Sequence, residues 1–135
     1  MKCYLDSSVV LRYLLNGDQS LTKIKSFKAV GSSRLLQTEC LRVINRYRLE
    51  NLIDDDQLVE VTRALDLMLG GMQLFRISDP VLARAGGPFP VVVGTLDAIH
   101  LATALLWDPQ VELFTFDKQL ARAAESMGIR LLATE

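Results

Sequence analysis

Two acidic residues stand directly after apolar runs, where a carboxylate can do chemistry. Asp6 follows residues 2–5, and Asp117 follows residues 111–116. In an open parallel sheet the functional crevice lies at the carboxyl ends of the strands, so both acids are expected at one rim. Aspartate is also a good helix N-cap, and each residue taken singly fits that structural role.

Two further acids lie on helical faces that otherwise look apolar. On a helix, Glu39 shares a face with Leu36, Cys40 and Val43, and a carboxylate there is costly unless it is paired or reaches water. Asp97 falls in a first helical turn, where a negative charge suits the helix dipole. The structural alternatives are a salt bridge to arginine for Glu39 and plain dipole complementation for Asp97.

Four carboxylates that converge would repel one another, and a divalent cation resolves that conflict. Hard oxygen ligands favour Mg²⁺ or Mn²⁺, held by a few carboxylates and several waters. Such a site activates water and neutralises charge on a phosphate without a histidine base. We therefore predict metal-dependent phosphodiester hydrolysis at Asp6, Glu39, Asp97 and Asp117.

The elements that must position these acids alternate between strand and helix. Hydrophobic periodicity, caps and glycine or proline breaks predict strands at 2–5, 29–30, 74–77, 111–116 and 130–133. The same signals predict helices at 9–15, 34–50, 54–69, 78–85, 95–107 and 117–127. This order predicts one α/β domain, residues 1–135, with a parallel sheet and helices on both of its faces.

Charge is unevenly distributed, although the net charge is only −1. Residues 22–48 carry seven bases and one acid, and residues 50–60 carry five acids and no base. A basic block of this size can bind a polyanion, whereas the alternative is two solvated helix faces of opposite sign. From their proximity to Glu39 in the sequence, we expect Arg34, Arg42 or Arg46 to grip phosphates.

The rest of the composition narrows the function classes. The chain has no phosphate-binding glycine loop and no nucleophile elbow, and His100, expected to pack in a helix interior, is its only histidine. Cys3 and Cys40 form no CxxC pair, and we expect both to be buried as small hydrophobic residues. Without an apolar run of about 20 residues or a signal-peptide pattern, we expect a reduced, cytoplasmic protein with no membrane segment.

Four segments together resemble a PIN domain, and more narrowly the VapC-type toxins of toxin–antitoxin pairs. The resemblance covers essentially the whole chain, and its most specific piece is Leu-Asp-Ala-Ile-His-Leu-Ala-Thr-Ala at 96–104. The other three segments are 4–9, 38–42 and 114–121. Residues 90–95 depart from the pattern, because many relatives carry a base there and this chain has none.

The resemblance implies a Rossmann-like parallel sheet and an endoribonuclease that hydrolyses RNA phosphodiester bonds with a metal-activated water. The family's acids carry over to Asp6, Glu39, Asp97 and Asp117, which would hold Mg²⁺ or Mn²⁺. Its supporting hydroxyls match Ser7 and Thr115, which would orient ligands or waters. The resemblance also implies a homodimer and a cognate antitoxin protein as partners.

Two other readings remain open from the residues. A catalytically silent PIN-like module could bind RNA or protein without cutting, although all four acids are present. A phospho-acceptor receiver domain also gathers acids at strand ends, but Asp6-Ser7-Ser8 lacks the acid pair that it needs.

Overall fold

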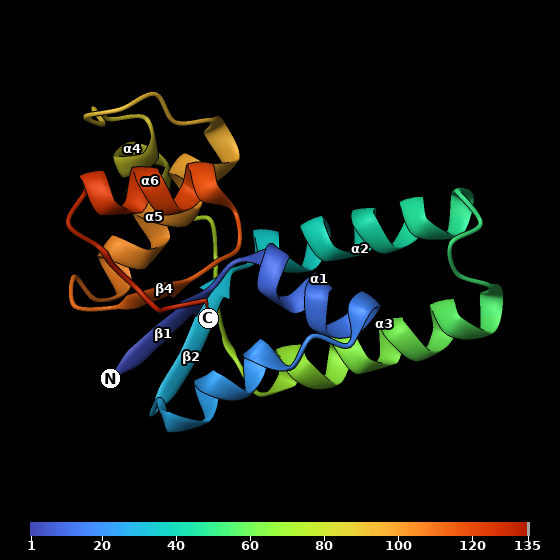
Figure 1. Ribbon diagram of the computed structural model, residues 1–135. Helices are drawn as coiled ribbons and strands as arrows, with labels where there is room; N and C mark the ends of the chain where they lie inside the picture. The colour runs from blue at the N-terminus through green and yellow to red at the C-terminus, as the bar shows by residue number, and fades with distance from the viewer. Residues whose placement is uncertain (135) are drawn as a thin grey trace.

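A five-stranded parallel sheet forms the centre of the computed structural model, which describes residues 1–134 (Figure 1). Its strands are β1 (Lys2–Leu5), β2 (Ala29–Ser33), β3 (Gln73–Phe75), β4 (Glu112–Phe114) and β5 (Arg130–Leu131). The α-helices are α1 (Ser7–Asn16), α2 (Leu35–Leu49), α3 (Asp55–Gly70), α4 (Asp79–Ala85), α5 (Thr95–Trp107) and α6 (Lys118–Ser126). A 3₁₀-helix, η1 (Gln19–Ser26), joins α1 to β2.

β1 is buried on both faces because successive side chains of a strand point to opposite sides. Cys3 and Leu5 pack with the apolar stripes of α1, α2 and α3, and Tyr4 packs with α5 and α6. As predicted, Cys3 and Cys40 are free and fully buried, and this burial is the main cause that raises the pKa of each thiol to about 12. The predicted parallel sheet with helices on both faces is thereby confirmed.

The strand order places a topological switch point beside β1. The order is β3-β2-β1-β4-β5, so the chain first adds strands on one side of β1 and then returns to the other side. Right-handed crossovers put the helices of the two halves on opposite faces, and a crevice opens where the order reverses. Asp6 and Asp117 follow the two strands that flank this point, β1 and β4.

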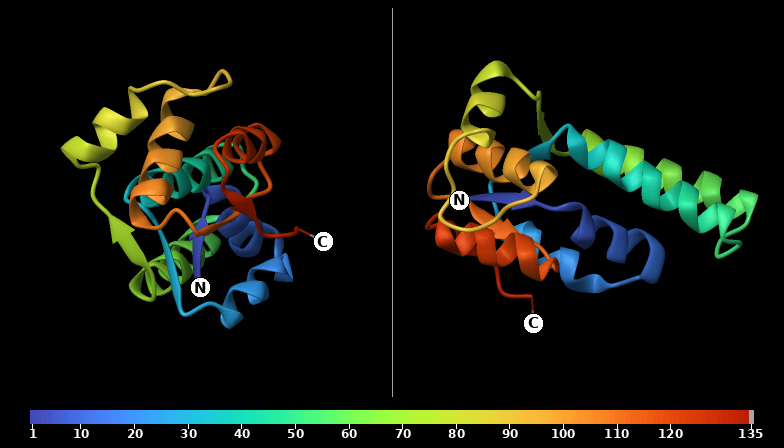
Figure 2. Two further views of the ribbon diagram at one scale, coloured as in Figure 1. Left: turned by 90° about the vertical axis from the view of Figure 1, so that its left-hand side faces the viewer. Right: turned by 90° about the horizontal axis from the view of Figure 1, so that it is seen from above.

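Helices α2 and α3 form a long antiparallel hairpin. Two views show their connecting turn projecting well away from the sheet (Figures 1 and 2). The Asp54 side chain accepts from the Gln57 amide, and the Gln57 side chain accepts from the Asp54 amide, which closes a capping box at the start of α3. Arg48 pairs with Asp55 at 3.2 Å across this turn, so part of the basic block and the acidic stretch satisfy each other.

Several predicted bounds differ from those observed. β4 ends at Phe114 rather than at residue 116, because the Phe116 amide donates to the Ser8 hydroxyl instead of a neighbouring strand. β5 ends at Leu131 rather than at 133, β3 covers Gln73–Phe75 rather than 74–77, and η1 was not predicted. Within residues 1–134, no helix is both long and apolar enough to cross a membrane.

Gly31 in β2 is a position where only glycine fits. A Cβ built there would lie 2.9 Å from the Gln73 carbonyl oxygen and 3.0 Å from the Trp107 ring. We expect Gly31→Ala to lower the free energy of unfolding, measured with urea, by about 1–3 kcal/mol. Gly70→Ala is the control, because a Cβ in α3 meets nothing within 4 Å and is expected to add about 0.5–1 kcal/mol. Equal effects of the two changes would contradict the packing argument.

Candidate active site

Asp6 is held by two hydroxyl groups at the carboxyl end of β1. Its Oδ2 accepts from Thr115 Oγ1 at 2.7 Å and from Ser8 Oγ at 2.7 Å. The Ser8 amide also donates to Oδ2, at 3.4 Å, so the Asp6 side chain caps α1. Asp6 is buried, with 6% of the residue exposed. Its second oxygen, Oδ1, has no hydrogen bond among residues 1–134.

Asp117 stands opposite Asp6, after β4, and is connected to it through Thr115. The Thr115 hydroxyl donates to Asp6 and accepts from the Asp117 amide at 2.9 Å. Asp117 Oδ1 in turn accepts from the amides of Gln119 and Leu120 and caps α6. Each of the two aspartates therefore caps a helix and also lies after a strand at the carboxyl end of the sheet, so the two expected roles are compatible.

Glu39 reaches the same rim from α2, and its partner is a histidine. Glu39 Oε1 lies 2.7 Å from His100 Nε2, and His100 Nδ1 lies 2.6 Å from the Tyr4 hydroxyl. His100 is 1% exposed, so the expectation that it packs inside is confirmed, but it also contacts a site residue. The partner of Glu39 is therefore this imidazole rather than an arginine.

The carboxyl group of Asp97 has a raised pKa, to which the neighbouring acids contribute. Its pKa is raised above the ordinary range, first by burial and then by the negative charges of Asp117 and Asp6, with Glu39 adding a smaller effect. The opposing effect of His100 is weaker than these together. The fold has thus gathered negative charge from β1, α2, α5 and the start of α6 around one rim.

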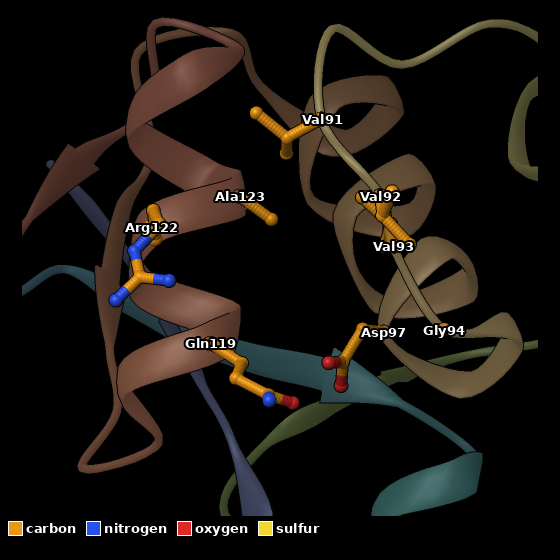
Figure 3. Close-up of a pocket in the computed structure, with 8 residues that line it drawn as sticks. All are labelled: Val91, Val92, Val93, Gly94, Asp97, Gln119, Arg122 and Ala123. Carbon is orange, nitrogen blue, oxygen red and sulfur yellow. The ribbon is translucent and has the colours of Figure 1, made fainter.

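A pocket of about 350 Å³ opens between α5 and α6 beside Asp97. Gln119 extends from α6 toward Asp97 across this pocket, and the guanidinium of Arg122 is turned away from it (Figure 3). Residues 91–94, which carry no charge, form the other wall. Gln119 and Arg122 lie two and five residues after Asp117 on α6, but no motif in the sequence marked them.

The structure separates the basic residues that lie near Glu39 in the sequence. Arg42 and Arg46 line a pocket of about 520 Å³ together with Glu39 and Ser7. Arg34 is exposed at the N-terminus of α2. Lys28 lies at the opposite end of the sheet, where its amide donates to the Met1 carbonyl. Of the three arginines expected to grip phosphates, Arg42 and Arg46 thus share a pocket with Glu39, whereas Arg34 is not among the residues that line it.

The hydroxyls near Asp6 also differ from the expected pair. Thr115 contacts Asp6, as a ligand-orienting role requires, whereas the second hydroxyl on Asp6 belongs to Ser8. Ser7 instead faces the pocket beside Glu39. The Asp-x-Ser spacing, typical of a side chain that accepts from the amide two residues on, was the sequence signal for Ser8.

The carboxylates of the site fit a divalent cation that keeps part of its water shell better than an ion enclosed by protein ligands alone. Within the described chain, no three Asp, Glu, His or Cys side chains stand close enough to enclose an ion by themselves. Mg²⁺ keeps several waters and is usually held by one or two carboxylates, so it does not need such an enclosure. Asp6 could bind such an ion through its free Oδ1. At Asp97, a cation would offset the repulsion from the neighbouring negative charges.

Comparisons with known proteins agree on one family. A family model described as PIN domain matches residues 3–126. Ribonuclease VapC46 from Mycobacterium tuberculosis is 30% identical over 134 residues, which cover 96% of this chain and 95% of that protein. Among solved structures, VapBC2 from Rickettsia felis bound to a promoter DNA fragment aligns with a TM-score of 0.71, 13% identity and 98% coverage of both chains. A toxin–antitoxin complex from Klebsiella pneumoniae aligns with a TM-score of 0.69, 16% identity and 98% coverage of both chains.

Proposed function

We propose that this chain, which belongs to the PIN-domain family and is a relative of the VapC ribonucleases, is a divalent-metal-dependent endoribonuclease. The family resemblance and the PIN-like fold predicted from the sequence are confirmed. Hydrolysis of internal RNA phosphodiester bonds is the activity that we infer for the site. We take residues 1–135 as one such domain.

One observation carries the proposal: Asp97 lies close enough to Asp117, Asp6 and Glu39 that their negative charges add to burial in raising its pKa. Acidic groups whose pKa is perturbed by burial and by neighbouring charges cluster at functional sites. We propose that Asp6, Asp97 and Asp117 hold Mg²⁺ or Mn²⁺ together with the waters that such an ion keeps, and that Glu39 binds it directly or through water. A divalent cation supplies there a lowered pKa for water and positive charge beside a phosphate.

The chain's own residues would position the two reactants. Thr115 and Ser8 orient the Asp6 carboxylate, and the start of α6 orients that of Asp117. Arg42 and Arg46 offer positive charge to the RNA backbone on the Glu39 side of the rim, and Arg34 extends it at the start of α2. Ser7, which lines the same pocket as Arg42 and Arg46, would orient a water or a ligand.

We also propose the partners that this family relationship suggests. The similar structures are toxin–antitoxin assemblies, so we infer that this chain is the toxin of a VapBC-type pair and is held by a cognate antitoxin. A homodimer and a cytoplasmic location complete the proposal.

Cleavage of total RNA by the purified, antitoxin-free protein tests this function. We expect discrete fragments with Mn²⁺ or Mg²⁺ and none when EDTA removes the ion, because water alone is a poor nucleophile at neutral pH. Cleavage that persists in EDTA would contradict the metal-dependent mechanism.

Calorimetric titration with Mn²⁺ distinguishes the alternative that the site is silent. A folded protein that neither binds Mn²⁺ nor cleaves RNA would favour a PIN-like module that binds RNA or protein without cutting. Binding of Mn²⁺ without cleavage of any RNA offered, including ribosomal and transfer RNA, would contradict the general nuclease and point to a narrow substrate.

A further inference from the structure

A continuous hydrogen-bonded path, here the Tyr4–His100 relay, supports Glu39 from behind. The Ser33 amide donates to the Tyr4 hydroxyl oxygen at 3.0 Å. Tyr4 meets His100 Nδ1 at 2.6 Å, and His100 Nε2 meets Glu39 Oε1 at 2.7 Å. Tyr4 and His100 are 0% and 1% exposed, so water does not compete for these contacts.

One consistent set of donors runs through the relay toward Glu39. A backbone N–H can only donate, so the Tyr4 oxygen accepts from Ser33 and can still donate its own proton to His100 Nδ1. In the tautomer that carries its proton on Nε2, the imidazole donates to Glu39, whose carboxylate can only accept. Glu39 receives this bond on Oε1 alone, which leaves the lone pairs of Oε2 available to a cation or a water.

The relay also links two of the four acids through packed structure. His100 lies three residues after Asp97 on α5, so the helix that carries Asp97 also anchors Glu39 of α2. The rings of Tyr4 and His100 pack edge to face, with centroids 5.7 Å apart and planes at 81°. This contact fixes the orientation of the imidazole in addition to its hydrogen bonds.

We propose that Tyr4 and His100 are positioning residues that hold the Glu39 carboxylate ready for the divalent cation, an inference that rests on the proposed function. A glutamate side chain has three rotatable bonds, and an acid that must find its geometry on binding loses affinity to ordering. The relay fixes one carboxylate oxygen before the cation arrives. Groups that orient a metal ligand in this way typically contribute about 10–100-fold to affinity or activity.

The first test removes one hydroxyl from the relay. Tyr4→Phe keeps the ring and its packing, and we expect it to weaken Mn²⁺ binding, measured by calorimetry, and RNA cleavage by about 10-fold or more. Thr103→Val is the matched control, because Thr103 is 2% exposed on α5, the helix of His100, and the substitution removes a bond of 2.7 Å to the Ile99 carbonyl. We expect this control to change Mn²⁺ binding less than about twofold.

A second pair of variants tests the donor itself and does not depend on how well Tyr4→Phe folds. His100→Leu removes the proton that Glu39 accepts, and His100→Gln restores an amide donor on a side chain of comparable reach. We expect Mn²⁺ affinity to fall in His100→Leu and to recover in part in His100→Gln. Equal affinities in these two variants, both shown to be folded, would overturn the proposal.

The decisive measurement repeats Tyr4→Phe in a Glu39→Gln background. If Tyr4 acts through the carboxylate, its effect on Mn²⁺ affinity disappears there, whereas a purely structural role gives the same loss in both backgrounds. A loss that persists with Glu39→Gln, or a Tyr4→Phe effect no larger than that of Thr103→Val, overturns the relay. Wild-type protein that binds no Mn²⁺ and cleaves no RNA overturns the proposed function instead.

Discussion

Asp6→Asn is expected to lower the rate of RNA cleavage about a thousandfold or more and to leave the fold intact. The substitution removes the negative charge, and the loss of one ligand charge at a divalent cation costs several kcal/mol of transition-state stabilisation. Asparagine keeps a carbonyl oxygen that accepts from Thr115 and Ser8. Asparagine also caps helices as well as aspartate does, so α1 loses little.

A matched control exists for this variant elsewhere in the chain. Asp18 is followed by a serine two residues on, as Asp6 is, and its side chain accepts from the Ser20 amide at 2.8 Å to cap η1. We expect Asp18→Asn to leave cleavage unchanged, measured on the same RNA under the same ion concentration. Full activity in Asp6→Asn, or an equal loss in both variants, would contradict the assignment of Asp6.

Asp97→Asn is expected to abolish cleavage and, unusually for a site substitution, to raise the melting temperature of the ion-free protein by a few degrees. The folded protein raises the pKa of Asp97, by burial first and then by Asp117 and Asp6. Ionising this group therefore costs more in the folded than in the unfolded state. Asparagine has the same shape and carries no charge, so the cost disappears.

The sign of the pH dependence follows from the same shift. Below the unfolded pKa, about 3.9 for aspartate, both states are protonated and the cost is absent. As the pH rises from there through the raised folded pKa, the unfolded state ionises more readily than the folded state, and the free energy of unfolding falls. At neutral pH the wild type therefore carries the whole destabilisation from ionised Asp97. The advantage of Asp97→Asn in EDTA should therefore shrink as the pH is lowered from 7 toward 4.

Adding Mn²⁺ should reverse the order of the two melting temperatures. An ion that binds only the folded state stabilises it by mass action, and the wild type binds it more tightly than Asp97→Asn does. Asp66→Asn, on the exposed surface of α3, serves as the control and is expected to leave both melting temperatures unchanged. A lower melting temperature for Asp97→Asn in EDTA would contradict the view that these carboxylates repel one another.

The elements of the fold were predictable because their signals are local. Helix α5 was predicted with its observed bounds, Thr95–Trp107, since Gly94 and Asp108 flank a mainly apolar stretch. Less local features were missed. The end of β4 was predicted two residues too late, because it depends on the Ser8 hydroxyl, which is 108 residues away in the sequence from Phe116.

The site followed the same division. Asp6 and Asp117 were recognisable because an acid directly after a buried strand belongs at the carboxyl edge of a parallel sheet. The partner of Glu39 was not, because charge patterns favoured an arginine and the actual contact is with His100. The division of the basic block was not predictable either: Arg42 shares a pocket with Glu39, and Lys28 lies at the opposite end of the sheet.

By itself, then, the sequence determined the alternation of strands and helices, the two acids that end strands, and the resemblance to a PIN domain. Periodicity, caps and short motifs act over a few residues, so a single chain suffices to read them. Only the tertiary structure decided which side chains meet: Thr115 with Asp6 over 109 residues, and Tyr4 with His100 over 96. Those contacts depend on the strand order, which reverses beside β1 and brings α5 and β4 back against the start of the chain.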